Sequence, residues 1–226
     1  MVQLPFSDRR DAGGYLAEEL ARHKHRDHAL VLALPRGGVP VGFAIAERLR
    51  LPLDVIVARK LGVPWQPELA MGAIAGSARF LDEEMIRNLG ITGDEVDLVA
   101  KREQAVMESR EALFRGGSPP LDLHNRAVIL VDDGLATGST MRAAVRCVRS
   151  QIPAAITIAV PVGSREACAQ LRTECDDFVC LSTPDPFYAV GMWFRDFAQV
   201  GDAEVHDLLV RTRHGMPNAQ AVRAGQ

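Results

Sequence analysis

Five short apolar runs, rich in Val, Ile and Leu, recur along the chain and predict buried strands. They are residues 28–34 (HALVLAL), 53–58 (LDVIVA), 127–131 (AVILV), 155–162 (AITIAVPV) and 178–182 (FVCLS). Apolar runs without polar alternation are typical of strands that are covered on both faces, as in parallel sheets. We therefore expect these segments to form one buried sheet.

Helical periodicity appears between the strands. Apolar residues recur every three or four positions in segments that predict helices over 8–23, 39–50, 139–151 and 164–174. Asp8 or Ser7 is the expected N-cap of the first. Residues 93–115 are dense in charge and predict a long, largely solvated helix. This alternation indicates an α/β fold with a doubly wound, mainly parallel sheet.

Two regions interrupt the alternation. Residues 61–82 combine Pro64, Pro67 and three glycines, and they predict a loop followed by a hairpin. Residues 183–200 concentrate prolines and aromatic side chains, although only 5% of the chain is aromatic. Because aromatic residues are rare in the chain as a whole, their concentration in this segment indicates a specific role for it.

Composition narrows the class of protein. The chain has 226 residues, of which 47% are hydrophobic and 24% charged, as expected for one globular domain. A formal net charge of −3 gives no basic footprint, so nucleic acid is not an expected partner. No apolar run approaches the ~20 residues of a membrane span, and no signal peptide is visible, so we expect a cytoplasmic protein. The four cysteines form no CxxC pair and are expected to be free thiols.

The stretch VILVDDGLATGST (128–140) carries the strongest chemical signal. Its two glycines and three hydroxyls can cradle an anion at the start of a helix. Asp132 and Asp133 precede that loop, and carboxylates would repel a phosphate alone. A sugar phosphate satisfies both halves, since its hydroxyls can bind the acids while its phosphate binds the loop.

This stretch resembles, over all 13 positions, the phosphoribosyl pyrophosphate (PRPP) motif of type I phosphoribosyltransferases. A Walker-B element would need a GxxxxGK[ST] loop, and the chain contains no Gly-Lys pair. A receiver domain would need a lysine after Lys101, and none follows. A plain strand-to-helix turn remains an open alternative.

The resemblance implies roles for further residues. The 5′-phosphate would bind Gly134, Leu135, Ala136, Thr137, Gly138, Ser139 and Thr140. The pyrophosphate would bind Arg36, Gly37 and Gly38 after the first strand, and Arg59 and Lys60 at the end of the second. From the residues alone, a tight turn and a solvated cationic strand end remain open for these two sites. The catalytic residues would be Asp132, Asp133, Lys60 and Glu68.

The region 61–82 corresponds by position to the family's mobile catalytic loop. Trp65, Gln66 and Glu68 are its candidates for closure or acid/base work. Many relatives have a Lys, an Arg or a Ser-Tyr pair in this loop, and PWQPELAMG has none.

In this family a hood over the ribose is built by the chain's two ends, which implies hood segments 1–25 and 183–200. The expected domain is then 1–212, with its core at 28–182 and a disordered tail at 213–226. The stretch TPDPFYAVGMWFRDF resembles the base-binding segment of 6-oxopurine phosphoribosyltransferases, which implies acceptor contacts from Phe187, Tyr188 and Asp196. No lysine follows residue 101, so purine specificity does not follow, and a purely hydrophobic cover remains an alternative.

We therefore expect a phosphoribosyltransferase that uses Mg²⁺ and PRPP, with the metal held mainly through PRPP near Asp132 and Asp133 rather than by protein ligands. The acceptor is a nitrogenous compound of unknown identity, nucleobases included. Two alternatives stay open: a PRPP sensor without turnover, and a hydrolase or transferase of another phosphorylated ribose. A homodimer is compatible with these features. His23, His25 and His28 are expected to form a solvated turn rather than a metal site.

Overall fold

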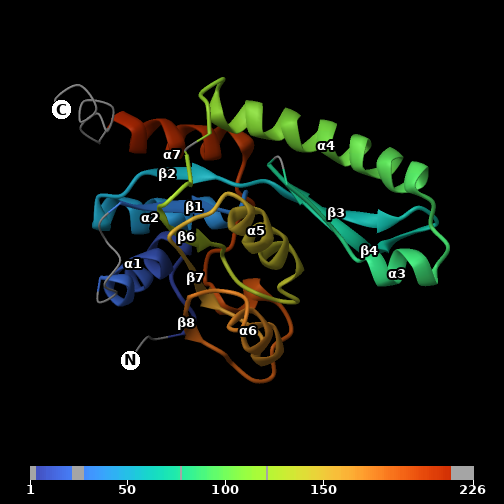
Figure 1. Cartoon of the computed structure of the whole chain (residues 1–226). Helices are drawn as coiled ribbons and strands as arrows, with labels where there is room; N and C mark the ends of the chain where they lie inside the picture. The colour runs from blue at the N-terminus through green and yellow to red at the C-terminus, as the bar shows by residue number, and fades with distance from the viewer. Residues whose placement is uncertain (1–3, 22–27, 77, 121, 215–226) are drawn as a thin grey trace.

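A five-stranded parallel sheet forms the centre of the molecule. The computed structural model describes residues 4–21, 28–76, 78–120 and 122–214. The strands are β1 (Ala29–Ala33), β2 (Leu53–Val55), β6 (Ala127–Val131), β7 (Ala155–Val162) and β8 (Asp177–Ser182), in the order β2-β1-β6-β7-β8 (Figure 1). Every neighbouring pair is parallel. The predicted sheet is confirmed, with strand ends that differ by a few residues.

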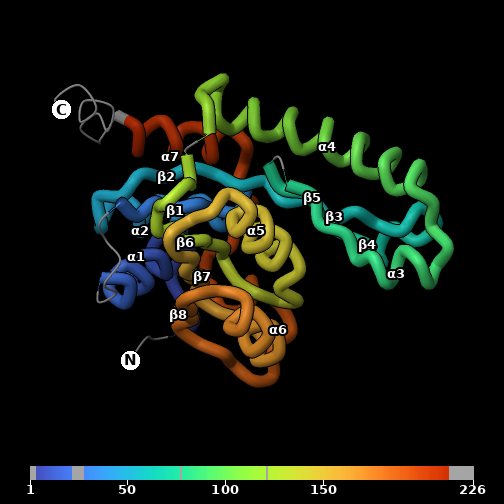
Figure 2. The backbone as a smooth tube through the Cα atoms, viewed as in Figure 1, coloured from blue at the N-terminus to red at the C-terminus, as the bar shows by residue number. Residues whose placement is uncertain are grey.

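Helices cover both faces of this sheet, which confirms the doubly wound α/β prediction (Figure 2). They are α1 (Arg9–Leu20), α2 (Gly38–Leu49) and α7 (Asp202–His214) on one face, and α5 (Ser139–Ser150) and α6 (Arg165–Leu171) on the other. Within β1, Val31 packs into the core that contains α1 and α2, whereas Leu30 and Leu32 pack into the core that contains α5 and α6. Alternate residues of a strand point to opposite faces, so one apolar run serves two cores.

Helix α1 begins as predicted, because the Asp8 carboxylate accepts a hydrogen bond from the backbone N–H of Asp11 at 2.8 Å. That bond satisfies one of the unpaired N–H groups of the first helical turn. The helix ends at Leu20, and residues 22–27 lie outside the described part of the chain.

The prediction of a loop followed by a hairpin at 61–82 was wrong in its first part. The chain forms a second, antiparallel sheet of β3 (Ala58–Val63), β4 (Gln66–Ala75) and β5 (Ala78–Leu81). Val63 pairs with Gln66 across a two-residue turn, and the register shifts at Gly62, where a Cβ would lie 2.4 Å from the carbonyl oxygen of Pro67. The glycine therefore permits close strand approach at a bulge rather than marking a loop.

The predicted strand 53–58 is in fact divided. β2 ends at Val55, and Ala58 already begins β3. Arg59 and Lys60 thus lie in the second sheet instead of at the carboxyl end of a central strand. An apolar run indicates burial, but it does not say which sheet buries it.

Helix α4 (Gly93–Arg115) has the predicted limits and begins with a capping box between Thr92 and Glu95. One side is buried, so "largely solvated" describes only its outer face: Val96, Val99, Met107 and Phe114 are in the core. With α3 (Glu83–Asn88) and the second sheet, its first half projects from the central sheet (Figure 1). Near its end, the buried Arg115 guanidinium bonds to the buried Asp54 carboxylate at 3.0 Å.

Helix α7 includes residues 213 and 214, which the sequence assigned to the tail, and residues 215–226 lie outside the described chain. All four cysteines are free, as predicted. Across the described residues, the helices are too short or too polar to cross a membrane.

Candidate active site

The carboxyl ends of β1 and β6 bring two of the predicted loops together. These strands are neighbours, and the Leu34 N–H donates to the Val131 carbonyl at 2.8 Å where both strands end. A Cβ on Gly38 would lie 2.7 Å from that same carbonyl oxygen, and a Cβ on Gly37 only 2.0 Å from Oδ2 of Asp133. The Arg-Gly-Gly turn therefore touches the acid pair directly.

The two acids are partly buried and hold each other in place. The Asp133 backbone N–H donates to Asp132 Oδ1 at 2.8 Å, and Arg9 Nε donates to Asp133 Oδ2 at 2.8 Å. Burial raises the pKa of Asp132 well above its ordinary value, and the neighbouring Asp133 charge adds to that effect. Burial also raises the pKa of Asp133, while the Arg9 guanidinium opposes the rise. Two carboxyl groups that are buried side by side are therefore an electrostatically costly arrangement.

The raised pKa of Asp132 predicts how the free energy of unfolding changes with pH. In the unfolded chain this carboxyl ionises near pH ~4, so above that pH the folded state binds more protons, and stability falls as pH rises through the raised folded-state pKa. Asp132→Asn removes this loss. We expect its free energy of unfolding to exceed that of the wild type by about 1 kcal/mol at pH 8, with a smaller gap near pH 4. Urea denaturation across that pH range measures it, and an equal pH dependence in both chains would contradict it.

The loop 134–140 has the geometry of an anion cradle. Gly138 has φ 73°, a left-handed conformation that glycine adopts without strain, and α5 begins at the next residue. Among the first N–H groups of α5, that of Ser139 lies 3.5 Å from Thr137 Oγ1 and that of Arg142 donates to the Gly138 carbonyl at 2.9 Å. The N–H groups between them precede the first possible intrahelical partner, and a helix start of this kind can bind an anion. The loop is braced by β7, because Leu135 N–H donates to the Val162 carbonyl at 2.9 Å and Ser164 Oγ donates to the Ala136 carbonyl at 2.8 Å.

The three predicted cations take different positions. Arg36 lies next to the glycine turn, 3.5 Å from the Asp202 carboxylate. Arg59 and Lys60 line a cavity of about 810 Å³ together with Ser139 and Thr140 at the end of the anion loop. The structure thus brings β3 and the anion loop to one cavity.

Both β3 cations already have carboxylate partners. Arg59 Nε donates to Glu103 Oε2 at 3.0 Å, and Lys60 Nζ donates to Glu68 Oε2 at 2.9 Å. The Glu68 side chain is 93% exposed, so its ion pair is accessible to solvent and to an incoming anion. The two residues predicted to be catalytic on this side of the site, Glu68 and Lys60, are therefore direct neighbours, while their roles stay predictions.

Of the predicted acceptor residues, Phe187 lies in an aromatic cluster, whereas Tyr188 and Asp196 are exposed. Phe187 stacks on Trp193 with ring centroids 6.4 Å apart, Tyr188 is 76% exposed, and Asp196 is exposed and accepts from the Ala198 N–H. Val190 reaches the acid-bearing loop, since a Cβ on Gly134 would lie 2.6 Å from its Cγ1. The segment 187–197 thus approaches the anion loop through Val190.

Arg9 is the site residue that sequence reasoning missed. It leaves the first turn of α1 and binds Asp133, more than a hundred positions away in sequence. The only sequence signal was an arginine directly after the N-cap, which is typical of any solvated helix start. Of the histidines in the predicted turn, His28 is exposed, while His23 and His25 lie outside the described residues.

Known proteins are similar to this chain in sequence and in fold. A family model described as "Phosphoribosyl transferase domain" matches residues 9–192. A Mycobacterium tuberculosis protein that bears the name putative phosphoribosyl transferase is 41% identical over 220 residues, which cover 97% of this chain and 49% of that protein. The chain therefore spans about half the length of this relative.

Solved structures agree on the architecture. The Thermus thermophilus protein TT1426 superposes with a TM-score of 0.83 at 39% identity, over 91% of this chain and 98% of that one. A Neisseria gonorrhoeae protein superposes with a TM-score of 0.51 at 12% identity, over 93% and 99% of the two chains, and shows the fold alone.

Proposed function

This chain belongs to the phosphoribosyltransferase family, and on that premise we propose that it transfers the 5-phosphoribosyl group of PRPP to a nitrogenous acceptor. The observation that carries the proposal is the contact between the Arg-Gly-Gly turn and the acid pair, at Gly37 and Asp133. A ligand at that contact reaches a pyrophosphate loop on one side and ribose-binding acids on the other. The anion loop 134–140 continues directly from the acids.

In the proposed reaction, the bond between ribose C1 and the pyrophosphate oxygen breaks, and its electron pair leaves with pyrophosphate. The acceptor nitrogen forms the new bond to C1 and loses a proton. Asp132 and Asp133 would orient the ribose hydroxyls and stabilise the positive charge that develops on the ring. Arg36, Arg59 and Lys60 would offset the charge of the leaving group, with Glu68 as the nearby acid/base candidate.

The chain's oxygen donors fit a magnesium ion that arrives with its substrate. Among the described residues, groups of three or more His, Cys, Asp or Glu suited to a metal are absent. Mg²⁺ is commonly bound by one or two carboxylates together with substrate phosphates, and Asp132 and Asp133 provide such carboxylates beside the phosphate loops. When bound, the ion would neutralise pyrophosphate charge.

Two measurements test the proposal. Calorimetric titration with PRPP, with and without Mg²⁺, tests binding, and a panel of nitrogenous bases is then screened for pyrophosphate release. Binding followed by base-dependent release supports transfer. No binding at millimolar PRPP rejects it, and release without a base indicates hydrolysis.

Lys60→Ala should weaken Mg·PRPP binding or turnover by about 10-fold, a loss of ~1.4 kcal/mol, because a cation that faces the pyrophosphate is removed. The same titration and assay measure the effect. Lys101→Ala is the matched control, since Lys101 is an exposed lysine on α4. If Lys60→Ala and Lys101→Ala changed PRPP binding and turnover to the same extent, the assignment of the pyrophosphate to β3 would be wrong.

The paired state of Arg59 and Lys60 favours one second candidate, a PRPP-binding regulatory protein without turnover. Cations that stay paired with Glu103 and Glu68 would contribute less to the leaving group than free ones. Mg·PRPP binding without pyrophosphate release against the base panel would support this candidate.

A further inference from the structure

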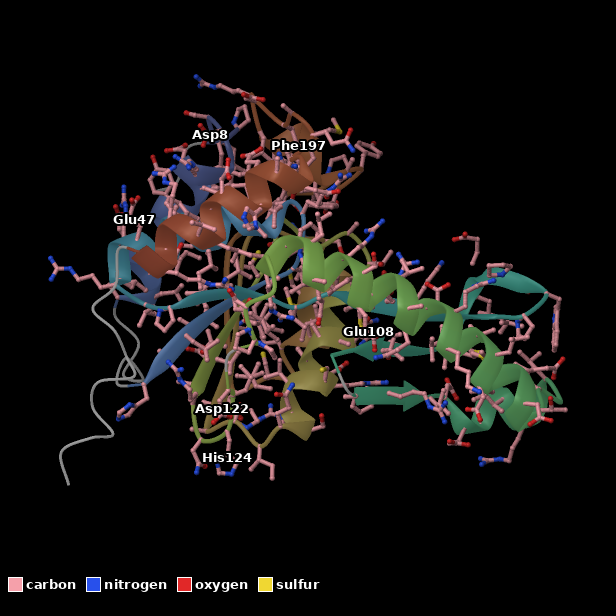
Figure 3. The ribbon with its side chains drawn as sticks, turned by 90° about the horizontal axis from the view of Figure 1, so that it is seen from above. Asp8, Glu47, Glu108, Asp122, His124 and Phe197 are labelled. Atoms are coloured by element: carbon pink, nitrogen blue, oxygen red, sulfur yellow. The ribbon has the colours of Figure 1, made fainter. Side chains whose placement is uncertain are left out.

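One guanidinium, that of Arg9, joins three separate parts of the chain. Nε donates to Asp133 Oδ2 at 2.8 Å, Nη1 donates to the Ala198 carbonyl at 2.8 Å, and the group lies 3.7 Å from the centroid of the Phe197 ring. The side chain is only 11% exposed. Seen from above, Asp8 and Phe197 occupy the same end of the molecule (Figure 3).

Two of the segments beside Arg9 form an aromatic cover, which we define as the side chains of Phe6, Tyr15, Trp193, Phe194 and Phe197. The Phe6 N–H donates to the Trp193 carbonyl at 2.9 Å, and the Phe6 and Phe194 rings lie 5.5 Å apart. Phe194 and Phe197 stack at 5.1 Å. The cover is thus built from both ends of the chain and meets the acid pair at Arg9.

The chemistry of these contacts requires arginine. A planar guanidinium directs donors to two different groups while its face stacks on a ring, and an ammonium cannot do all three. The two oxygens of the Asp133 carboxylate differ in this contact: Oδ2 accepts from Arg9, so Oδ1 is the oxygen that a ligand hydroxyl would approach. A charged hydrogen bond of this kind is short and strong, so it sets the direction of the second carboxylate oxygen, Oδ1.

We propose that Arg9 is a positioning residue of the ribose site, which orients Asp133 and docks the aromatic cover through the same side chain. Ribose binding and docking of the cover are then coupled, and by linkage each favours the other. This inference rests on the proposed function for its ligand.

The chain's two tryptophans allow a direct test. Trp65 is exposed on the turn between β3 and β4, and Trp193 belongs to the cover. In a Trp65→Phe reference chain, Trp193 alone reports the cover by its quenching with acrylamide. Mg·PRPP affinity is measured by calorimetry in the same chain.

Three variants are compared in this reference chain. Arg9→Ala removes all contacts, and Arg9→Lys restores charge near Asp133 without the planar two-way donor. Arg10→Ala is the matched control, because Arg10 is exposed and stacks on Phe43, 5.0 Å away, instead of on the cover. Thermal melting by circular dichroism shows that each variant is folded.

We expect Arg9→Ala to bind Mg·PRPP about 10-fold more weakly and to quench more readily, with no protection of Trp193 on adding PRPP. Arg9→Lys should recover part of the affinity but not the protection, and Arg10→Ala should behave as the reference. Unchanged affinity in Arg9→Ala overturns the inference, whatever the quenching shows. If the wild-type chain and the reference chain both fail to bind PRPP, the proposed function fails, and the quenching of Arg9→Ala alone decides whether Arg9 docks the cover.

Discussion

Gly37→Ala is expected to lower PRPP-dependent pyrophosphate release about 100-fold, because a displacement of about 1 Å in a catalytic site can have an effect of that size. The new Cβ would lie 2.0 Å from Oδ2 and 2.6 Å from Cγ of Asp133. The backbone at Gly37 has φ −61°, which any residue adopts, so the cause is contact and not strain. If Asp133 moves to make room, its hydrogen bond to Arg9 is lost. If the Arg-Gly-Gly turn moves instead, its contact with the two acids is lost.

Steady-state assays of kcat/KM and calorimetry with Mg·PRPP measure this effect. Gly93→Ala is the matched control: it makes the same chemical change at the first residue of α4, where a Cβ has no atom within 4 Å. Near-wild-type values in Gly37→Ala would show that PRPP does not use the contact between the turn and the acid pair.

Asp133→Asn is expected to weaken Mg·PRPP binding or turnover by about 100-fold, which corresponds to ~2.7 kcal/mol and lies within the range of charged hydrogen bonds. The amide has the shape of the carboxylate, but it removes the negative charge that faces the ribose and Arg9. Because burial raises the pKa of Asp133, loss of its charge should leave the fold intact. We therefore expect this variant to lose PRPP binding or turnover while its melting temperature stays close to that of the wild type.

The same assays, together with thermal melting, check this second expectation. Asp97→Asn is its control, since it also breaks an Asp–Arg pair, to Arg79 at 2.6 Å, on the outer part of α4. Wild-type binding by Asp133→Asn, or equal losses in both variants, would refute the ribose role of Asp133.

The central strands were predictable because their signal is local. Residues 127–131 and 155–162 form strands with the predicted limits, since a continuous Val/Ile run suits a strand covered on both faces. The anion loop was equally visible, because its glycines and hydroxyls lie within one short stretch. The carboxyl ends of parallel strands share one edge, so the fold class placed this loop at that edge, whereas the pairing of β1 with β6 that sets it beside Gly37 came from the structure.

The region 61–82 shows where local reasoning fails. Its prolines and glycines suggested a loop. In the structure Pro64 lies in a two-residue turn and Gly62 at a bulge, both within an antiparallel sheet. That sheet is stabilised by packing against α4 and α5, which lie far along the chain. Hairpin pairing together with packing against other elements outweighs the local preference of single residues.

By itself, the sequence determined the α/β class, the five buried strands and the stretch that pairs two acids with an anion loop, because periodicity and short motifs are properties of neighbouring residues. Only the tertiary structure decided which side chains meet at that motif. Arg9 reaches Asp133 across 124 positions, and Arg59 and Lys60 pair with Glu103 and Glu68. Contacts of that kind depend on how helices pack on the sheet, and a helix start in the sequence does not reveal its distant partner.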